Sequence, residues 1–270
     1  LNFEARGSGG PSYMLMETNG GNKNLIEAFQ KANTPYPAAN SLMYSVYKML
    51  PNDTDLTVFR EDGDIDGFNF AFIGDHFDYH TAQDTVERMD LNTFQHQVSY
   101  LTATLNYFSN ADVSNLKADE DFVYFNFPYV GMVFYPFTWI VPMLVVCIVL
   151  FFVLLIVGLS NRKLTIIGVL KGFIPFMVSL LISSVLAIYG WKVLLKIHPN
   201  YTDILHGFTY NGYYYIAAFV ALTLAICFWF YKGFFKKQTA QDLAIAPLFS
   251  WIFINVGIAF YLPGAAFFII

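Results

Sequence analysis

The sequence predicts an α/β domain followed by an α-helical transmembrane region of four or five spans. Residues 1–130 carry seven Lys or Arg and 18 Asp or Glu, a formal net charge of −11. Residues 131–270 carry eight Lys or Arg and two Asp or Glu, a net charge of +6. Short apolar runs occur in the first part, and long apolar runs fill the second. This division predicts a soluble domain joined to a membrane region, and the acidity of the domain argues against a nucleic-acid partner.

Strands and helices alternate in the first part. Short apolar runs predict three strands, at 1–4, 13–17 and 68–73. Apolar residues at helical spacing predict three helices, at 24–32, 41–50 and 92–108. The second helix is expected to end before Pro51, because the residue preceding a proline disfavours helical geometry. This alternation is typical of an α/β sandwich, in which ligand sites lie at the ends of strands.

The predicted organisation is an α/β domain at 1–112, a linker at 113–133 and a transmembrane region at 134–270. The apolar runs that are long enough to cross a bilayer lie at about 134–159, 164–190, 212–231 and 243–270. Pro263 and Gly264 interrupt the last run, so a fifth span could begin there.

The orientation of the chain follows from its short basic loops. Basic residues join the first two spans at 161–163 and follow the third span at 232–237. Because cytoplasmic loops are enriched in Lys and Arg, both loops are expected in the cytoplasm. The N-terminal domain is then expected on the non-cytoplasmic side, in the periplasm, an organelle lumen or a vacuole. Lys192 and Lys196, in the outer loop, count against this orientation.

Candidate metal ligands lie near two strand ends. Glu4 ends the first predicted strand, and His80 lies in the polar loop that follows the strand at 68–73. Carboxylate oxygen and imidazole nitrogen are both zinc ligands. The chain has two cysteines, Cys147 and Cys227, and both lie within apolar runs, so neither a disulfide framework nor a Cys-based zinc site is expected.

Four motifs in order resemble the C-terminal half of the zinc aminopeptidase domain of the M28 family. They are Asn-Phe-Glu-Ala-Arg-Gly at 2–7, Leu-Pro-Asn-Asp-Thr-Asp at 50–55, Asn-Phe-Ala-Phe-Ile at 69–73 and Tyr-His-Thr-x-x-Asp at 79–84. The chain is most similar to the membrane-bound branch, the endoplasmic-reticulum metallopeptidase and vacuolar membrane protease type. The resemblance implies the C-terminal portion of an αβα peptidase domain followed by transmembrane helices, with peptides as substrates.

The resemblance also implies roles for individual residues. The family uses two zinc ions, and Glu4 matches a ligand of one ion while His80 matches a ligand of the other. Tyr79 matches the tyrosine that holds the substrate carbonyl, and Asp84 is assigned a supporting position beside the His80 loop. The family's remaining ligands and its catalytic Glu have no counterpart after Leu1. We therefore expect a C-terminal part of a longer protein, inactive by itself and weak in zinc binding.

Other interpretations remain open at this point. The main alternative is a non-catalytic membrane protein whose M28-like domain binds peptides or partners. A transporter or channel is less favoured, because the spans carry few ionisable residues and show no internal repeat. A glutaminyl cyclase shares the fold but does not usually carry several spans. A local metal site of His76 and His80 is disfavoured, because no helix would hold the two side chains rigidly.

Overall fold

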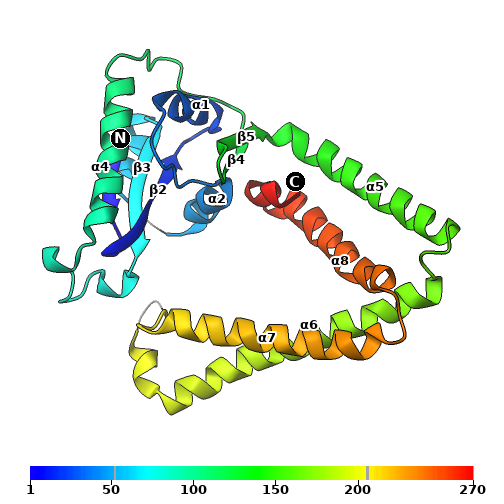
Figure 1. The fold of residues 1–270 in the computed structure, drawn as a ribbon. Coiled ribbons are helices and arrows are strands. Elements are labelled where there is room, and N and C mark those ends of the chain that lie inside the picture. The colour runs from blue at the N-terminus through cyan, green and yellow to red at the C-terminus, as the bar shows by residue number, and fades with distance from the viewer. Residues whose placement is uncertain (52, 205–206, 270) are drawn as a thin grey trace. The chain divides into compact units, whose positions relative to one another are not determined.

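The computed structural model describes residues 1–51, 53–204 and 207–269. Ile270, the last residue of the range expected for the fourth span, lies outside this part. The chain divides into two compact units, Leu1–Leu144 with Gly257–Ile270 and Val145–Val256. The first unit is an α/β domain with a returning C-terminal segment, and the second consists of helices (Figure 1).

A three-stranded sheet forms the centre of the first unit, in the order β1-β3-β2. Strand β3 (Gly67–Gly74) runs parallel to β1 (Asn2–Ala5) and antiparallel to β2 (Gly9–Glu17). The register pairs Glu4 with Ala71 and Met14 with Phe70. The three strands predicted from the sequence are therefore confirmed, and the α/β class with them.

Helices pack on this sheet, namely α1 (Lys23–Ala32), α2 (Ser41–Met49), α3 (Asp55–Gly63) and α4 (Leu91–Phe108). The sequence predicted α1, α2 and α4 but not α3. The short α3 has no continuous apolar stripe, and its first turn depends on polar contacts. The side chain of Thr57 accepts a hydrogen bond from the backbone N–H of Thr54 at 3.0 Å, which satisfies a donor that helix N-termini leave free.

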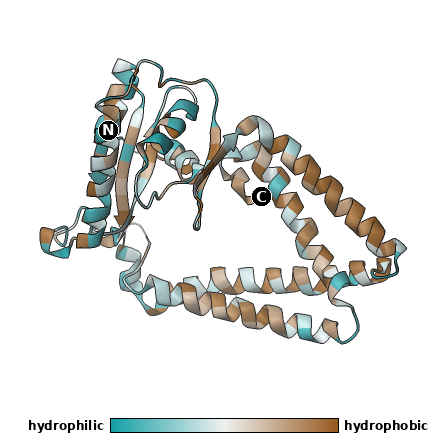
Figure 2. Cartoon of the chain, turned by 45° about the horizontal axis from the view of Figure 1, so that its top comes forward, coloured by the Kyte–Doolittle hydropathy of each residue, from teal (hydrophilic) through white to brown (hydrophobic). Residues whose placement is uncertain are grey.

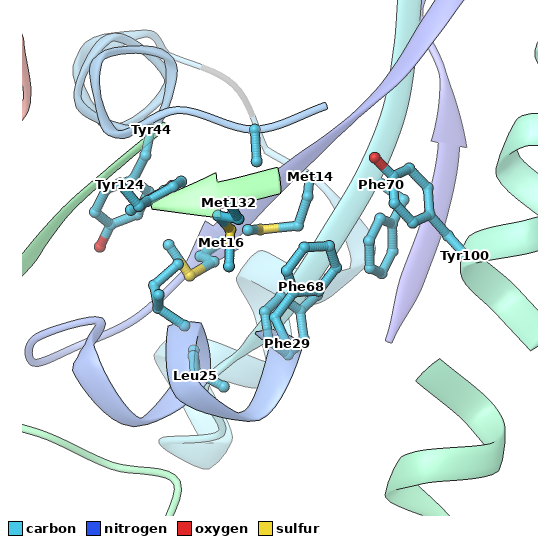
Figure 3. Packing of buried hydrophobic residues seen from close by; sticks show 12 residues of the cluster. Met14, Met16, Leu25, Phe29, Tyr44, Phe68, Phe70, Tyr100, Tyr124 and Met132 are labelled. Carbon is cyan, nitrogen blue, oxygen red and sulfur yellow. The ribbon is translucent and has the colours of Figure 1, made fainter. Parts of the chain in front are cut away.

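The hydrophobic core lies on one face of the sheet (Figure 3). Met14 of β2 and Phe70 of β3 are paired across the two strands, so their side chains point to the same face of the sheet. They meet Phe29 of α1 and Tyr100 of α4, whose ring centroid lies 4.9 Å from that of Phe70. Full burial of one such side chain is worth about 1.5–3 kcal/mol. The opposite face of the sheet carries Glu4 and is where the candidate site lies.

A hairpin of β4 (Phe122–Phe127) and β5 (Gly131–Pro136) occupies much of the range expected to be a linker. Its formation depends on partners distant in sequence. The side chain of Ser41 accepts a hydrogen bond from the backbone N–H of Tyr124 at 3.1 Å, and Tyr124 joins the core. Since β5 takes up residues to 136, the first candidate span begins at Phe137 and not at 134.

The segment after the last span also differs from the sequence prediction. Residues Pro263–Ile269 form the 3-10 segment η5, which packs on α2 and β4. The hydroxyl of Ser41 donates to the backbone oxygen of Gly264 at 2.6 Å, and the ring of Phe267 stacks on Phe125 with centroids 5.4 Å apart. Residues 263–269 therefore pack on the α/β domain and do not begin a fifth span.

Four helices among the residues that the structure describes are long and apolar enough to cross a membrane. They are α5 (Ile140–Ser160) with the preceding η3 (Phe137–Trp139), α6 (Ile166–Ile197), α7 (Gly212–Phe235) and α8 (Ala240–Tyr261). Their mean hydropathy reaches 3.5 in the first and 1.9 in the third. Figure 2 shows the apolar residues concentrated along these helices. The chain is thus an integral multi-pass membrane protein.

One carboxylate joins two of these helices. Asp242 is buried in the first turn of α8 and accepts a hydrogen bond from the hydroxyl of Thr239 at 2.9 Å. Its other oxygen accepts from the backbone N–H of Thr165 at the start of α6, also at 2.9 Å. Helix N-termini favour negative charge and have free N–H groups, so a single side chain stabilises both ends.

Candidate functional site

Glu4 lies on β1 and is held by its neighbours on the sheet. The side-chain amide of Asn2 donates to a carboxylate oxygen of Glu4 at 2.7 Å and to the side chain of Asn69 at 3.2 Å. The amide of Gln97, on α4, donates to the backbone oxygen of Glu4 at 3.1 Å. The carboxylate is therefore oriented by a neighbouring side chain and keeps further acceptor capacity for a ligand.

His80 lies in the loop between β3 and α4, just after η1 (His76–Asp78). Its backbone is left-handed, with a φ of 56°, and its side chain is exposed. The imidazole stacks on the ring of Tyr79 with centroids 3.8 Å apart. A carboxylate oxygen of Asp84 accepts from the backbone N–H of His80 at 3.4 Å, so Asp84 contacts the backbone of this loop and not the imidazole.

A buried carboxylate anchors the same loop. Asp78 is only 1% exposed and accepts hydrogen bonds from the hydroxyl of Ser8 at 2.5 Å and from Nε of Arg88, in η2 (Val86–Arg88), at 2.9 Å. Asp78 therefore joins this loop to the turn after β1. Loss of one partner from a buried ion pair is costly, so Asp78 fixes the backbone that carries Tyr79 and His80.

Arg6 brings the end of β1 next to this loop. Its guanidinium carbon lies 5.8 Å from the centroid of the Tyr79 ring, within the range of a cation–π contact. The backbone oxygen of Arg6 pairs with Nδ1 of His76 at 3.0 Å. Strand β1, which carries Glu4, and the loop that carries His80 are thus adjacent, as expected for residues at the ends of neighbouring strands.

A cavity of about 520 Å³ joins these elements on the face of the sheet opposite the core. Glu4, Arg6 and Tyr79 line it, whereas His80 is absent from its lining. The apolar wall comes mainly from α2, with Leu42, Met43, Val46 and Leu50 among its residues. No role was predicted for this helix from the sequence, although apolar residues at these spacings mark one face of a helix.

Glu17 stabilises the end of the cavity that Tyr47 and Thr54 line. Its carboxylate is 6% exposed and accepts from the hydroxyls of Tyr47 at 2.8 Å, Thr54 at 2.8 Å and Thr57 at 2.9 Å. Nε of Arg60 donates to the other oxygen at 3.1 Å. Burial would raise the pKa of Glu17, yet these four hydrogen bonds together hold it below its ordinary value. Burial, and next the contact with Glu17, raise the pKa of Tyr47 to about 12.

The donor types here suit zinc, but their number does not complete a site. Across residues 1–51, 53–204 and 207–269, no three His, Cys, Asp or Glu side chains lie close enough together to hold a metal ion. Of the two cysteines, Cys147 lies in α5 and Cys227 lies in α7. Structural and catalytic zinc sites use at least three protein ligands, so Glu4 and His80 by themselves do not form one.

A family profile matches the N-terminal part of the chain. Residues 1–105 match the profile described as Peptidase family M28. This part of the chain is therefore similar to peptidase family M28. The M28 region therefore includes the sheet, α1 to α3, the His80 loop and most of α4.

Proteins named as metallopeptidases and as membrane proteases are among the relatives. Endoplasmic reticulum metallopeptidase 1 of Rattus norvegicus is 31% identical over 115 residues, which cover 42% of this chain and 13% of the relative. Putative endoplasmic reticulum metallopeptidase 1-B of Caenorhabditis elegans is 29% identical over 157 residues, covering 56% and 17%. Vacuolar membrane protease of Candida dubliniensis is 30% identical over 129 residues, covering 47% and 13%.

These relatives are much longer than the aligned segment. The chain spans 12% to 17% of the length of the first three relatives. No solved structure gives a significant match. The M28 match and these relatives support the resemblance to the membrane-bound branch of the family that the sequence motifs predicted.

Proposed function

We propose that this protein is part of a membrane-anchored zinc metallopeptidase that removes N-terminal residues from peptides. The observation that carries the proposal is the shared cavity of Glu4 and Tyr79, with His80 stacked on Tyr79, inside the M28 region. Carboxylate and imidazole can hold zinc, and a phenol can donate a hydrogen bond to the oxyanion that forms in metal-assisted peptide hydrolysis.

Each of these residues has a separate role. Glu4 and His80 would each supply one ligand to a different ion of a two-zinc centre that needs further ligands. Zinc bound there would supply polarisation of the substrate carbonyl and a hydroxide at neutral pH. The phenol of Tyr79 donates a hydrogen bond to the substrate oxygen as it gains negative charge. Asp84 and Asp78 hold the loop so that Tyr79 and His80 stay in position.

The cavity indicates which substrates fit. Its volume of about 520 Å³ is ample for the side chain of a large residue, and the wall from α2 is apolar. We infer that the first residue of the peptide is an apolar one, seated against Met43 and Val46. Glu4, the proposed zinc ligand, lines the same cavity.

The orientation in the membrane is also a proposal. The loop at 161–163 and the residues at 232–237 are basic, which favours the cytoplasm for both. The start of α5 and the end of α8 both belong to the first unit, as an even number of crossings requires. The M28 region then faces the periplasm, lumen or vacuole, and its substrates are peptides of that compartment.

The test uses the protein purified from its native membrane, with leucine aminomethylcoumarin as the substrate and zinc content measured in parallel. Glu4→Ala and His80→Ala should each lower hydrolysis by at least about 100-fold, because removal of groups that stabilise the transition state has effects of this size. Each variant should also lose bound zinc. His198→Ala is the matched control, because His198 is exposed in the outer loop and has no assigned role. Full activity in a correctly folded His80→Ala variant contradicts the proposal.

A non-catalytic peptide-binding protein is the second candidate. The absence of a three-ligand cluster among the residues that the structure describes favours it. In that case the wild-type protein binds the same peptides without hydrolysing them, and chelation of zinc leaves the binding unchanged.

A further inference from the structure

The tip of the β4–β5 hairpin exposes apolar side chains and has no charge. Phe127 is 54% exposed, Val130 is 68% exposed and Tyr129 is fully exposed. Tyr129 has a φ of 65°, a conformation that is unfavourable for an aromatic residue, and Gly131 follows with a φ of 90°. Residues 122–136 contain no Asp, Glu, Lys or Arg, although the domain around them is strongly acidic. Soluble proteins normally protect such an exposed strand end with charged residues.

Two parts of this hairpin lie next to points where the chain enters the membrane. At its base, β5 runs directly into η3 and the first span, and Trp139 there is 58% exposed. Near its middle, Phe125 stacks on Phe267 of η5, which follows the end of the fourth span at Tyr261. Trp and Tyr concentrate at membrane–water interfaces, so Trp139 and Tyr261 mark that level.

These two positions fix the direction of the hairpin. A strand residue near the base and another near the middle both lie close to the interface, so the hairpin runs along the membrane surface and not away from it. Its tip is then at the same level. We propose that Phe127, Tyr129 and Val130 insert into the interfacial layer of the bilayer and seat the α/β domain on the membrane. This inference does not depend on the proposed peptidase activity.

The chemistry of the tip fits a lipid surface. Aromatic and aliphatic side chains without charge enter the boundary between headgroups and acyl chains to about 5–10 Å. The phenol of Tyr129 can remain at headgroup level while its ring contacts the acyl chains. Because the tip carries no basic residue, its insertion does not require anionic lipid.

Seating of the hairpin also determines where the cavity lies. Ser41 of α2 contacts η5, whereas Met43 and Val46 of the same helix line the cavity. A helix with its side chains is about 10–12 Å wide. The cavity is thus about one helix diameter from the segment that leaves the membrane.

The test places a fluorescent label at the tip. Tyr129→Cys is made in the full 270-residue chain with Cys147→Ala and Cys227→Ala, labelled with a nitrobenzoxadiazole dye and reconstituted into phosphatidylcholine vesicles. Thr102→Cys is the matched control, because Thr102 is exposed on α4. Figures 1 and 2 both show α4 on the side of the domain away from the hairpin.

The label at residue 129 should be quenched by lipid carrying a nitroxide at acyl carbon 5 and be protected from aqueous iodide. The label at residue 102 should show the reverse. Replacement of phosphatidylcholine by a mixture with phosphatidylserine should leave the quenching at residue 129 unchanged. Equal iodide quenching at the two positions, in protein that elutes as a single species, overturns the proposal. Quenching at residue 129 that appears only with phosphatidylserine also overturns it, because the uncharged tip should need no anionic lipid.

Discussion

Glu17 offers the sharpest test of what holds the α/β domain together. Its buried carboxylate accepts four hydrogen bonds, from Tyr47 in α2, Thr54 and Thr57 at the start of α3, and Arg60 within α3. Glu17→Ala leaves three hydroxyls and a guanidinium without their acceptor. Helix α3, in which Leu56 is the only buried apolar side chain, should lose the polar part of its attachment to the rest of the domain.

The expected magnitude follows from these contacts. A hydrogen bond to a charged group is worth about 1.5–3 kcal/mol, but the four share one carboxylate and their contributions do not add. Arg60 keeps 26% of its side chain in solvent, so water offsets part of the loss there. Loss of one partner from a buried ion pair costs about 3–5 kcal/mol. The partial exposure of Arg60 places the cost of Glu17→Ala near the lower end of this range. About 3 kcal/mol corresponds to roughly a 100-fold change in an equilibrium.

Hydrogen exchange read by mass spectrometry in vesicles measures this change locally. The amides of residues 55–63 should exchange roughly 100-fold faster in Glu17→Ala, because exchange follows the free energy of local opening. Glu61→Ala is the control, since Glu61 is an exposed partner of the same Arg60 and such pairs contribute less than about 1 kcal/mol. Exchange in α3 that changes equally in the two variants would refute the role assigned to Glu17.

Three further predictions follow from the same structure. The folded pKa of Glu17 lies below its ordinary value, so the stabilisation from its carboxylate should be complete above the ordinary Glu pKa of about 4.3 and be lost as pH falls through the lower folded pKa. Exchange in α3 should therefore rise at that low pH in the wild type but not in Glu17→Ala. Gly264→Val should release η5 from α2, because a Cβ at this position overlaps the hydroxyl of Ser45, and exchange of α2 residues reports it; unchanged protection of α2 contradicts the contact. Asp242→Ala should lower the thermal stability of the protein in detergent by the equivalent of about 1–2 kcal/mol, because the N-termini of α6 and α8 lose their shared acceptor. Asp203 is exposed in the outer loop, so Asp203→Ala should have little effect.

Local pattern accounts for most of the fold that the sequence predicted. Short apolar runs marked the strands at 13–17 and 68–73, and helical spacing marked α1, α2 and α4. The apolar runs gave the four spanning helices, although their bounds moved by several residues. The prediction missed α3 and the β4–β5 hairpin, because both depend on partners far away in the chain, such as Glu17 for α3 and Ser41 for the hairpin.

For the candidate site, too, some features follow from the local sequence and others depend on distant parts of the chain. The sequence by itself determined that the chain combines an acidic α/β domain with spanning helices, and motif resemblance selected Glu4, Tyr79, His80 and Asp84, because residue type and spacing are local properties. Only the tertiary structure decided that Glu4 and Tyr79 line one cavity and that α2 forms its wall. Such contacts join residues tens of positions apart, and they arise from the packing of whole elements, which no short segment of sequence encodes.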